Sequence, residues 1–414
     1  MIEFGLVGET LSHSHSPRIH RALGDYSYEL IEVDPTGLDR LLRERAFRGL
    51  NVTIPYKVDA MGYCDALTDE AREIGSVNTL TFDRQNRLWG HNTDLYGFET
   101  MARNAGISLT DRKVLILGSG GSCRTATAAA KRAGAREIVV VSRSGRVDYD
   151  AAKRLHSDAD VIVNTTPVGM YPNNGNAPIS LSDFPQCAGV LDLVYNPLRT
   201  ALLLDAMDRG IPHADGLTML AAQALRASEL FTNTAIDADR VGMIVADIRS
   251  QLSNITIIGM PGSGKSVVGC ALARRFSRPF VDLDKMIETR AGKTIPEIFA
   301  ESGETVFREI ERAAAADVGK RGGQIIAAGG GAALDQRNVD AFRQNGRLLY
   351  LRRPLESLER SGRPLSTGFD ALAEMERVRL PIYKKVSDAV VDNAGSLPKV
   401  IERAEAVVSD LLYL

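Results

Sequence analysis

The stretch Ile255–Ser266 constrains the fold of this chain more than any other part of its sequence. Four apolar or β-branched residues lead into Gly259, and the spacing G-x-x-x-x-G-K-S then ends at Lys265 and Ser266. An apolar helical pattern follows, from Val267 to Phe276. A strand, a glycine-rich loop and a helix start in this order predict a phosphate-binding loop, or P-loop.

The residue types of this loop suit nucleotide phosphates. Gly262 and Gly264 allow backbone N–H groups to turn inward on an anion, and the helix N-terminus adds partial positive charge. Lys265 can reach the outer phosphates, and Ser266 can hold Mg²⁺. The loop therefore predicts a nucleotide, but it does not identify the acceptor of the phosphoryl group.

The length and charge of the chain narrow its class. At 414 residues it is too long for one core, so we expect two or three domains. A net charge of −2 shows no basic excess for nucleic acid. No apolar run reaches the ~18 residues of a membrane span, and the N-terminus lacks a signal pattern. We therefore expect a cytoplasmic protein without nucleic-acid or membrane partners. Its four cysteines lack CxxC spacing, which favours reduced thiols over a zinc site.

The first hundred residues alternate strand and helix patterns. Strands are predicted at Glu3–Val7, Tyr28–Val33 and Gly49–Ile54, with a helix at Leu38–Ala46 between the last two. This alternation predicts a parallel α/β sheet, which places ligands at the carboxyl ends of its strands.

Lys57 and Asp94 are the candidate chemical residues of this part. Lys57 comes just past the third predicted strand, and Asp94 precedes a helical pattern at Phe98–Ala105. A lysine polarised by a carboxylate can donate a proton to a carbonyl oxygen that takes up hydride. Two simpler interpretations stay open: Lys57 as a solvated surface charge, and Asp94 as a helix N-cap.

Three polar residues in this half also allow two interpretations. Ser16 precedes Pro17, a pair typical of a helix start with Ser16 as N-cap. Ser14 and Ser16 could instead offer hydroxyls to a polar ligand. Gln223 lies on a predicted helix, Leu217–Phe231, where it could face a ligand or solvent.

A dinucleotide site is predicted in the middle of this half. A strand at Lys113–Leu117 runs into the glycine turn Gly118–Cys123, and an alanine-rich helix and a strand at Ile138–Val141 follow. This is the β-turn-α-β unit of dinucleotide sites. An NAD site would place an acid after the second strand, whereas this chain has Ser142, Arg143 and Ser144. A guanidinium and hydroxyls suit a 2′-phosphate, which favours NADP, although Arg143 could also be a solvated loop residue.

Taken together, the segment from Met1 to about Ser250 resembles shikimate dehydrogenase. The resemblance is carried by motifs at Ser14–Pro17, Asn51–Lys57, Gly75–Leu80, Asn92–Asp94, Gly118–Gly121, Asn164–Met170, Asp192–Pro197 and Asp215–Gln223. It implies a two-lobed fold with a Rossmann-like NADP lobe, in which Lys57 and Asp94 form the catalytic pair. The implied substrate-binding residues are Ser14, Ser16, Thr53, Lys57, Asn78, Asp94, Tyr195 and Gln223. The implied NADP-binding residues are Gly118, Ser119, Gly120, Gly121, Ser122, Ser142, Arg143, Ser144, Asn164, Thr165, Met170, Gly216 and Met219.

The sequence departs from this family at two places. Leu95 follows Asp94 where the family usually has glycine, and only about twenty residues separate Arg143 from Asn164. We therefore expect a shortened cofactor lobe, with a remnant helix at Asp150–His156.

The second half continues the α/β pattern after the P-loop. A strand at Pro279–Leu283 reaches Asp282 and Asp284, which would face opposite sides if the strand continued. Asp284 could instead be a helix N-cap. Helices are predicted at Ile295–Ala300 and Glu304–Ala314. A strand at Ile325–Ala328 then meets three glycines, which allow close approach of a ligand. Two arginines, Arg360 and Arg363, lie on a Gly/Pro/Ser-rich loop, as suits a lid over phosphates.

The segment from Ile255 to about Leu412 resembles shikimate kinase. The matching pieces are the P-loop, Asp282-x-Asp284, Phe307–Glu309, Gly329–Gly331, Arg363–Leu365 and Arg379-x-Pro381-x-Tyr383. By this resemblance Asp284 is the base, and Lys265 and Arg363 neutralise the transferring phosphoryl group. The implied shikimate-binding residues are Asp284, Arg308, Gly330, Gly331 and Arg379. The implied nucleotide-binding residues are Gly259, Gly262, Ser263, Gly264, Lys265, Ser266, Val267, Arg360 and Arg363, with Ser266 and Asp282 at Mg²⁺.

The sequence thus predicts an α/β protein that fuses a two-lobed dehydrogenase to a P-loop kinase with a parallel sheet. The predicted dehydrogenase spans 1–252, with a substrate lobe at about 1–105 plus 216–252 and an NADP lobe at about 106–215; the kinase spans 253–414. We expect NADPH-dependent reduction of 3-dehydroshikimate and ATP-dependent phosphorylation of shikimate, in a monomer or homodimer. Two alternatives stay open: quinate as a substrate of the first half, and an inactive shikimate-sensing regulator.

Overall fold

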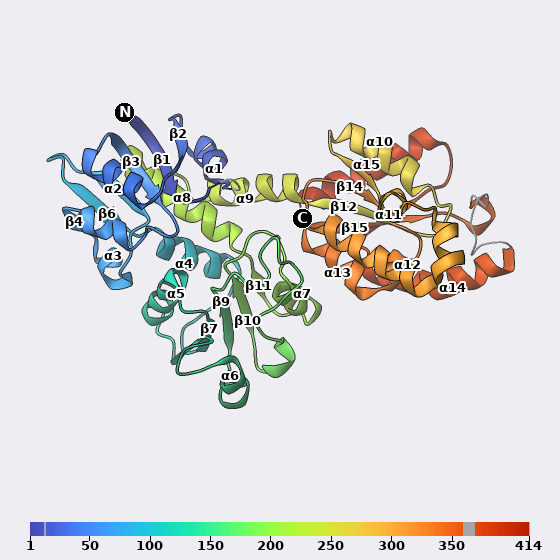
Figure 1. Cartoon of the computed structure of the whole chain (residues 1–414), viewed down its shortest axis with the longest axis horizontal. Coiled ribbons are helices and arrows are strands. Elements are labelled where there is room, and N and C mark those ends of the chain that lie inside the picture. Colours follow the sequence, from blue (N-terminus) through green and yellow to red (C-terminus); the bar gives the residue numbers. More distant parts are fainter. Residues whose placement is uncertain (12–13, 359–368, 414) are drawn as a thin grey trace. The chain divides into compact units, whose positions relative to one another are not determined.

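The computed structural model describes residues 1–11, 14–358 and 369–413 (Figure 1). The contacts within the chain divide it into two units. The first unit comprises Met1–Met170, Asn176–Tyr195 and Asp205–Val245, and the second comprises Tyr171–Gly175, Asn196–Leu204 and Ala246–Leu414. In the described residues, no helix has both the length and the apolar character needed to cross a lipid bilayer.

The first unit contains a six-stranded sheet in the order β2-β1-β3-β5-β6-β4. Its strands are β1 (Ile2–Gly8), β2 (Tyr28–Glu32), β3 (Phe47–Val52), β4 (Ala66–Leu67), β5 (Thr79–Phe82) and β6 (Leu88–His91). The helices α1 (Ser16–Leu23), α2 (Pro35–Glu44) and α3 (Asp69–Ile74) connect them, with a 3₁₀ turn at Asp59–Tyr63.

This sheet is mixed, which corrects the prediction of a parallel sheet. The strand β1 pairs in parallel with β2 and β3, as the alternation of strands and helices predicted. The strand β5, however, runs antiparallel to both β3 and β6. A tight turn joins β5 to β6, where the N–H of Asp83 donates to the carbonyl of Arg87. Because so short a connection cannot carry the chain back along the sheet, the two strands must be antiparallel.

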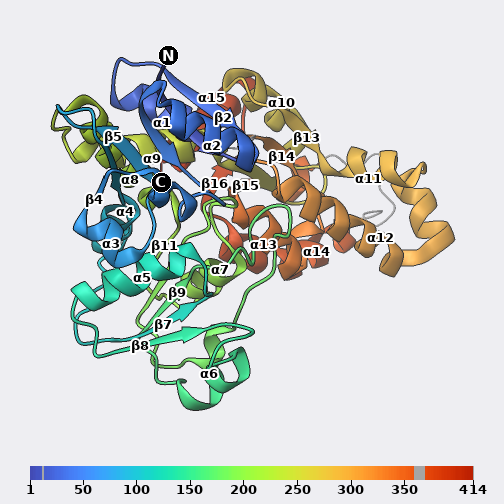
Figure 2. The ribbon, with the colours of Figure 1, turned by 60° about the vertical axis from the view of Figure 1, so that its left-hand side comes forward.

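The second sheet of this unit is parallel, in the order β11-β10-β9-β7-β8. Its strands are β7 (Lys113–Leu117), β8 (Glu137–Val141), β9 (Val161–Asn164), β10 (Gly189–Asp192) and β11 (His213–Ala214). The associated helices are α4 (Asp94–Asn104), α5 (Gly121–Arg132), α6 (Tyr149–Leu155), α7 (Ala201–Asp208) and α8 (Leu217–Thr232), with a 3₁₀ turn at Leu181–Asp183. Figure 2 shows α5 beside β7 and β8, on which it packs. The helix predicted at Asp150–His156 is confirmed as α6.

The second unit is built on a parallel sheet in the order β13-β14-β12-β15-β16. Its strands are β12 (Asn254–Ile258), β13 (Phe280–Asp282), β14 (Ile325–Ala327), β15 (Gly346–Arg352) and β16 (Ala389–Asp392). Its helices are α10 (Lys265–Arg275), α11 (Leu283–Ala291), α12 (Ile295–Gly319), α13 (Gln336–Gln344), α14 (Phe369–Val386) and α15 (Leu397–Tyr413), with 3₁₀ turns at Ala332–Leu334 and Leu355–Ser357. The helix α9 (Asp239–Leu252) leads into β12 with one residue between them.

Helices cover both faces of this third sheet, as buried parallel strands require (Figure 1). One core joins the strands to α10 and α15 through residues such as Val268, Leu272 and Val408. The other joins them to α11, α12 and α13 through residues such as Leu283, Phe307 and Phe342. The sheets and helices of the chain confirm the predicted α/β class.

The helix α12 contains one break. Gly303 has φ 76° and ψ 174°, values outside the helical region, so the two halves of α12 meet at a kink. This agrees with the two helices predicted at Ile295–Ala300 and Glu304–Ala314. The first half begins with a capping box, in which the Thr294 side chain and the Glu297 side chain each satisfy the other's backbone N–H.

Candidate active sites

The first site is centred on an ion pair between Lys57 and Asp94. The Lys57 Nζ lies 2.6 Å from the Asp94 Oδ2. The Lys57 side chain is 25% exposed and the Asp94 side chain 8%, so this pair is better shielded from water than an ordinary surface ion pair. Lys57 follows the carboxyl end of β3, and Asp94 is the first residue of α4, with Thr93 rather than Asp94 at the N-cap.

Two amide side chains surround this pair. The Asn78 Nδ2 donates to the Asp94 Oδ1 at 3.0 Å and to the Thr93 Oγ1 at 3.0 Å. The Gln223 Oε1 lies 3.4 Å from the same Asn78 nitrogen. Folding thus gathers Lys57, Asn78, Asp94 and Gln223 from four separate parts of the chain into one polar cluster.

The predicted serines lie at the start of α1. The Ser14 Oγ accepts a hydrogen bond from the N–H of Ser16 at 3.2 Å. Ser16 is the first residue of the helix and not its N-cap, which is His15. The ring of Tyr195 lies 6.0 Å from the ring of His15, and burial raises the pKa of Tyr195. Thr53 directly follows β3, and its N–H donates to the carbonyl of Val7.

The glycine turn after β7 has the open backbone that a dinucleotide needs. Gly118 has φ +110°, and a Cβ there would lie 2.7 Å from the Thr165 Oγ1. A Cβ at Gly120 or Gly121 would meet nothing within 4 Å. Ser119 and Ser122 lie in the same turn. After β8, Ser142 is buried, whereas Arg143 and Ser144 are exposed. The turn therefore fits a pyrophosphate, and the exposed guanidinium fits a 2′-phosphate.

The remaining predicted NADP residues divide into two groups. Met170 is 44% exposed and accessible to a cofactor. Asn164 is buried, and its amide bonds to Asp192 and Thr166 inside the protein. Gly216 lies close to the backbone of Leu193, since a Cβ at Gly216 would lie 2.1 Å from the carbonyl oxygen of Leu193. Met219 is also buried. The roles of these residues toward NADP stay predictions.

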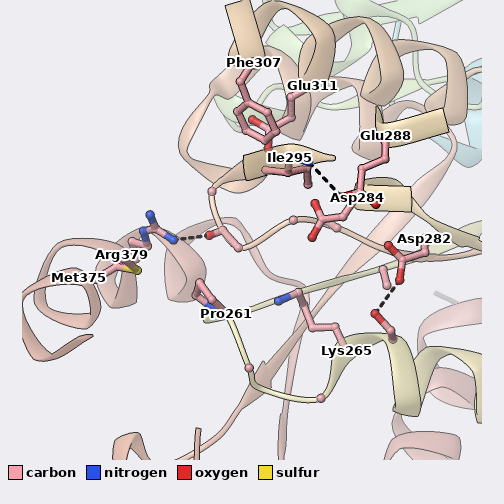
Figure 3. A pocket seen from close by; sticks show the side chains of 18 of the residues that line it. Pro261, Lys265, Asp282, Asp284, Glu288, Ile295, Phe307, Glu311, Met375 and Arg379 are labelled. Atoms are coloured by element: carbon pink, nitrogen blue, oxygen red, sulfur yellow. Dashed lines mark hydrogen bonds between the residues drawn. The ribbon is translucent and has the colours of Figure 1, made fainter. Parts of the chain in front are cut away.

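The second site is built around the P-loop between β12 and α10. Lys265 is buried, and its ammonium donates to the carbonyls of Gly259 and Met260 at 3.0 Å each. The Ser266 Oγ donates to the Asp282 Oδ2 at 2.7 Å (Figure 3). Gly262 and Gly264 have φ +80° and +93°, which glycine adopts without strain. Val267, at the start of α10, is 55% exposed.

The strand β13 ends earlier than predicted. The Asp282 side chain accepts a hydrogen bond from the N–H of Lys285 and so caps α11. Asp284 therefore lies in the first turn of α11, not on the strand. Both carboxylates still line one cavity of about 510 Å³, together with Lys265 and Arg379 (Figure 3).

Each glycine of the run Gly329–Gly331 approaches a different part of this cavity. A Cβ at Gly329 would lie 2.6 Å from the Asp284 Oδ1. One at Gly330 would lie 2.7 Å from the Pro261 ring, and one at Gly331 would lie 2.5 Å from the Arg308 Nη1. A Cβ at Gly330 would meet the ring and the backbone nitrogen of Pro261, so this glycine is required by packing, whereas a Cβ at Gly329 or Gly331 would displace the ends of the Asp284 and Arg308 side chains that line the cavity.

Two arginines are held at the cavity wall. The Arg308 Nη1 donates to the Glu311 Oε2 at 2.8 Å, and its Nη2 donates to the Glu304 Oε1 at 3.0 Å. The Arg379 Nη1 donates to the carbonyl of Gly330 at 3.0 Å. Glu311 was not predicted from the sequence, although its spacing of three from Arg308 on a helix was a usable signal. Burial raises the pKa of Glu311, and the nearby charges of Asp284 and Asp335 act in the same direction.

Arg360 and Arg363, the predicted lid arginines, lie outside the described residues, so their roles stay predictions. The geometry elsewhere brings together a shielded lysine–carboxylate pair in one unit and a P-loop beside a polar cavity in the other.

The comparisons with known proteins agree with this division. Residues 6–80 match the family model for the shikimate dehydrogenase substrate binding domain, and residues 261–411 match that for shikimate kinase. The chain is 34% identical over 252 residues to an NADP(+) shikimate dehydrogenase of Clostridium beijerinckii. The match covers 56% of this chain and 93% of that relative.

Two solved structures are similar to the same part of the chain. One is shikimate dehydrogenase 1 of Peptoclostridium difficile, with 35% identity, a TM-score of 0.55, and coverage of 60% of this chain and 98% of that one. The other is the shikimate 5-dehydrogenase of Thermus thermophilus in complex with NADP(H) and shikimate, with 32% identity, a TM-score of 0.53, and coverage of 60% and 99%.

The chain belongs to the shikimate dehydrogenase family and carries a shikimate kinase region in addition. It is a bifunctional enzyme of the shikimate pathway, an NADP-dependent oxidoreductase and an ATP-dependent kinase.

Proposed function

We propose that the first part of the chain, about residues 1–252, reduces 3-dehydroshikimate to shikimate, and that the second, about 253–414, phosphorylates shikimate at its 3-hydroxyl. The observation that carries the proposal is that two polar sites in one chain suit the same small acid. One contains the Lys57–Asp94 pair, and the other has Asp284, Arg308 and Arg379 on the cavity next to the P-loop.

In the first site, Lys57 is the proton donor. NADPH, when bound, would supply the hydride, and the Lys57 ammonium would give a proton to the oxygen that becomes the new hydroxyl. Asp94 orients the Lys57 side chain through their ion pair and accepts a hydrogen bond from Asn78, which fixes the orientation of its own carboxylate. Ser14, Ser16, Thr53, Asn78, Tyr195 and Gln223 would hold the hydroxyls and carboxylate of the substrate.

In the second site, Asp284 accepts the proton of the attacking hydroxyl. Arg308 and Arg379 bind the shikimate carboxylate, for which their guanidinium groups are suited. Gly330 and Gly331 bring the backbone close to the ring of the substrate. Lys265 leaves the carbonyls of Gly259 and Met260 to neutralise charge on the phosphates, with Arg363 as a second predicted cation.

The Ser266–Asp282 pair fits a magnesium ion. Its hydroxyl and carboxylate oxygens are the hard ligands that Mg²⁺ prefers, and they lie 2.7 Å apart next to Lys265. Ser266 would bind the ion directly and Asp282 through water. When bound, Mg²⁺ would neutralise the phosphate charge that develops during transfer.

Two assays on the purified full chain test the proposal. We expect shikimate-dependent reduction of NADP⁺ and shikimate-dependent release of ADP from ATP. Absence of both would contradict the proposal. Quinate is the alternative substrate of the first part, and a kcat/KM for quinate above that for shikimate would favour it. Shikimate binding without any turnover would instead favour a sensing regulator, which the presence of Lys57, Asp94, Lys265 and Asp284 opposes.

A further inference from the structure

A further arginine reaches the P-loop from the end of β15. Arg353 follows the last residue of this strand, is partly buried, and lines the same cavity as Gly262, Gly264 and Lys265. Its Nη1 donates to the carbonyl oxygen of Gly262 at 3.4 Å. The same nitrogen lies 3.9 Å from the place that a Cβ at Gly264 would take.

The preceding residue, Arg352, has a different environment. Its guanidinium forms a two-bond ion pair with Asp392, in which the Nη2 lies 2.8 Å from the Oδ2. Arg352 is exposed and does not line the cavity. Because successive side chains of an extended chain point to opposite faces, Arg352 and Arg353 lie in different environments.

Arg353 lacks the kind of partner that Arg352 has. Within residues 1–11, 14–358 and 369–413, no carboxylate lies within ion-pair distance of its guanidinium. Its hydrogen bond to Gly262 is long and has a neutral carbonyl as acceptor. This bond uses one of the five N–H donors of the guanidinium. A partly buried guanidinium beside Lys265, in a cavity built for an anion, favours a phosphate group as its partner.

A second residue supports the loop from the same side. The Asn393 Nδ2, just after β16, donates to the carbonyl of Ser263 at 2.6 Å. Arg353 and Asn393 therefore both contact carbonyls of the P-loop, on consecutive residues. Carbonyls held in this way leave the N–H groups of the loop to face the anion.

We propose that Arg353 is a nucleotide-binding residue of the kinase site, whose guanidinium donates to the phosphates that the P-loop holds. The inference rests on the proposed kinase function. Because Arg353 lies beside Gly262 and Gly264, and such loops enclose the inner phosphates, its contact is common to ATP and ADP. On binding, the long bond to the neutral carbonyl is replaced by charge-assisted bonds to phosphate oxygens.

The test measures the affinity of the full chain for ATP and for ADP by calorimetry. Arg353→Gln keeps an N–H donor for Gly262 and removes the charge, whereas Arg353→Lys keeps the charge. We expect Arg353→Gln to weaken both nucleotides about tenfold or more, and Arg353→Lys to lose clearly less. The matched control Arg352→Ala should bind both nucleotides within twofold of the wild type.

Three results would overturn this inference. One is a wild-type affinity of Arg353→Gln for both nucleotides, which would show that Arg353 only stabilises the loop. Another is an equal loss in Arg352→Ala, and the last is a loss for ATP without a loss for ADP. Chemical denaturation of each variant, which follows the unfolding of the second unit, checks that this unit is folded. If the wild type itself releases no ADP with shikimate, the proposed kinase function fails, whereas the variants test Arg353 alone.

Discussion

The Lys57–Asp94 pair is the contact on which the first activity depends most directly. Lys57→Met keeps a side chain of similar length but removes the ammonium. We expect kcat for the reduction of 3-dehydroshikimate to fall by about 10²–10⁴, because the general acid is lost. The affinity for NADPH, measured by fluorescence titration, should stay within twofold. A kcat within tenfold of the wild type would show that Lys57 is not the proton donor.

His20 gives the first unit a pH-dependent stability. It is buried on α1, its Nδ1 lies 2.7 Å from the Tyr26 hydroxyl, and its ring stacks on Tyr28. Burial lowers the pKa of His20 to about 3, and a hydrogen bond with Asn51 opposes the shift only partly. In the unfolded chain the same imidazole titrates near pH 6.5. Between these values the unfolded chain binds a proton that the folded chain does not.

The free energy of unfolding should therefore fall as the pH drops below about 6.5, by up to about 1.4 kcal/mol per pH unit for His20. Chemical denaturation between pH 6.5 and pH 5 measures this slope. His91, whose pKa burial lowers to about 4, contributes in the same direction. His20→Gln should reduce this slope by the contribution of the one proton that His20 binds in the unfolded chain. Equal slopes in the variant and the wild type would contradict this assignment.

At the residue scale, motifs predicted which side chains carry chemistry but not all of their neighbours. Lys57 and Asp94 are 37 residues apart, and no local pattern shows that they meet. Arg353 belongs to no sequence motif and was not predicted as a site residue. Only the fold shows that β15 ends beside the P-loop and places Arg353 there. Glu311 could have been found, since a spacing of three from Arg308 is a helical pair.

At the scale of elements, close backbone contacts determine which glycines are needed. Gly319, at the end of α12, would place a Cβ 2.1 Å from the carbonyl oxygen of Ala341 on α13. Gly242 on α9 is exposed, and a Cβ there would meet nothing within 4 Å. One glycine is therefore required by packing, and the other only weakens its helix.

Gly319→Ala should destabilise the second unit by about 1–3 kcal/mol, because α12 and α13 must move apart. Gly242→Ala should raise stability by about 0.5–1 kcal/mol through the higher helix propensity of alanine. Denaturant titration of both variants measures the two effects. Shifts in the same direction would show that the contact between α12 and α13 is not as close as described.

The strands and helices around both sites were predictable because their apolar patterns are regular. The ends of elements were harder to predict. Asp282 and Asp284 are both good caps, and only the bond from the Lys285 N–H shows that Asp282 ends the strand. The antiparallel direction of β5 was not predicted, although the short connection Asp83–Arg87 between β5 and β6 leaves no room for a crossover.

At the scale of the whole molecule, the two sites lie in different units and on different sheets. Lys265→Ala should abolish shikimate-dependent ADP release and leave NADP⁺ reduction within twofold of the wild type. Lys57→Met should do the converse. The reason is that Lys57 bonds to Asp94 in the first unit, whereas Lys265 bonds to carbonyls of the P-loop in the second. Loss of both activities from either substitution would contradict independent sites.

The most direct test of the account supplies the purified chain with 3-dehydroshikimate, NADPH, ATP and Mg²⁺ in one reaction. Shikimate 3-phosphate is then measured by mass spectrometry, together with NADPH oxidised and ADP released. We predict that one NADPH is oxidised and one ADP is formed for each shikimate 3-phosphate. NADPH oxidation or ADP release without any shikimate 3-phosphate would contradict the claim that both sites serve the same acid.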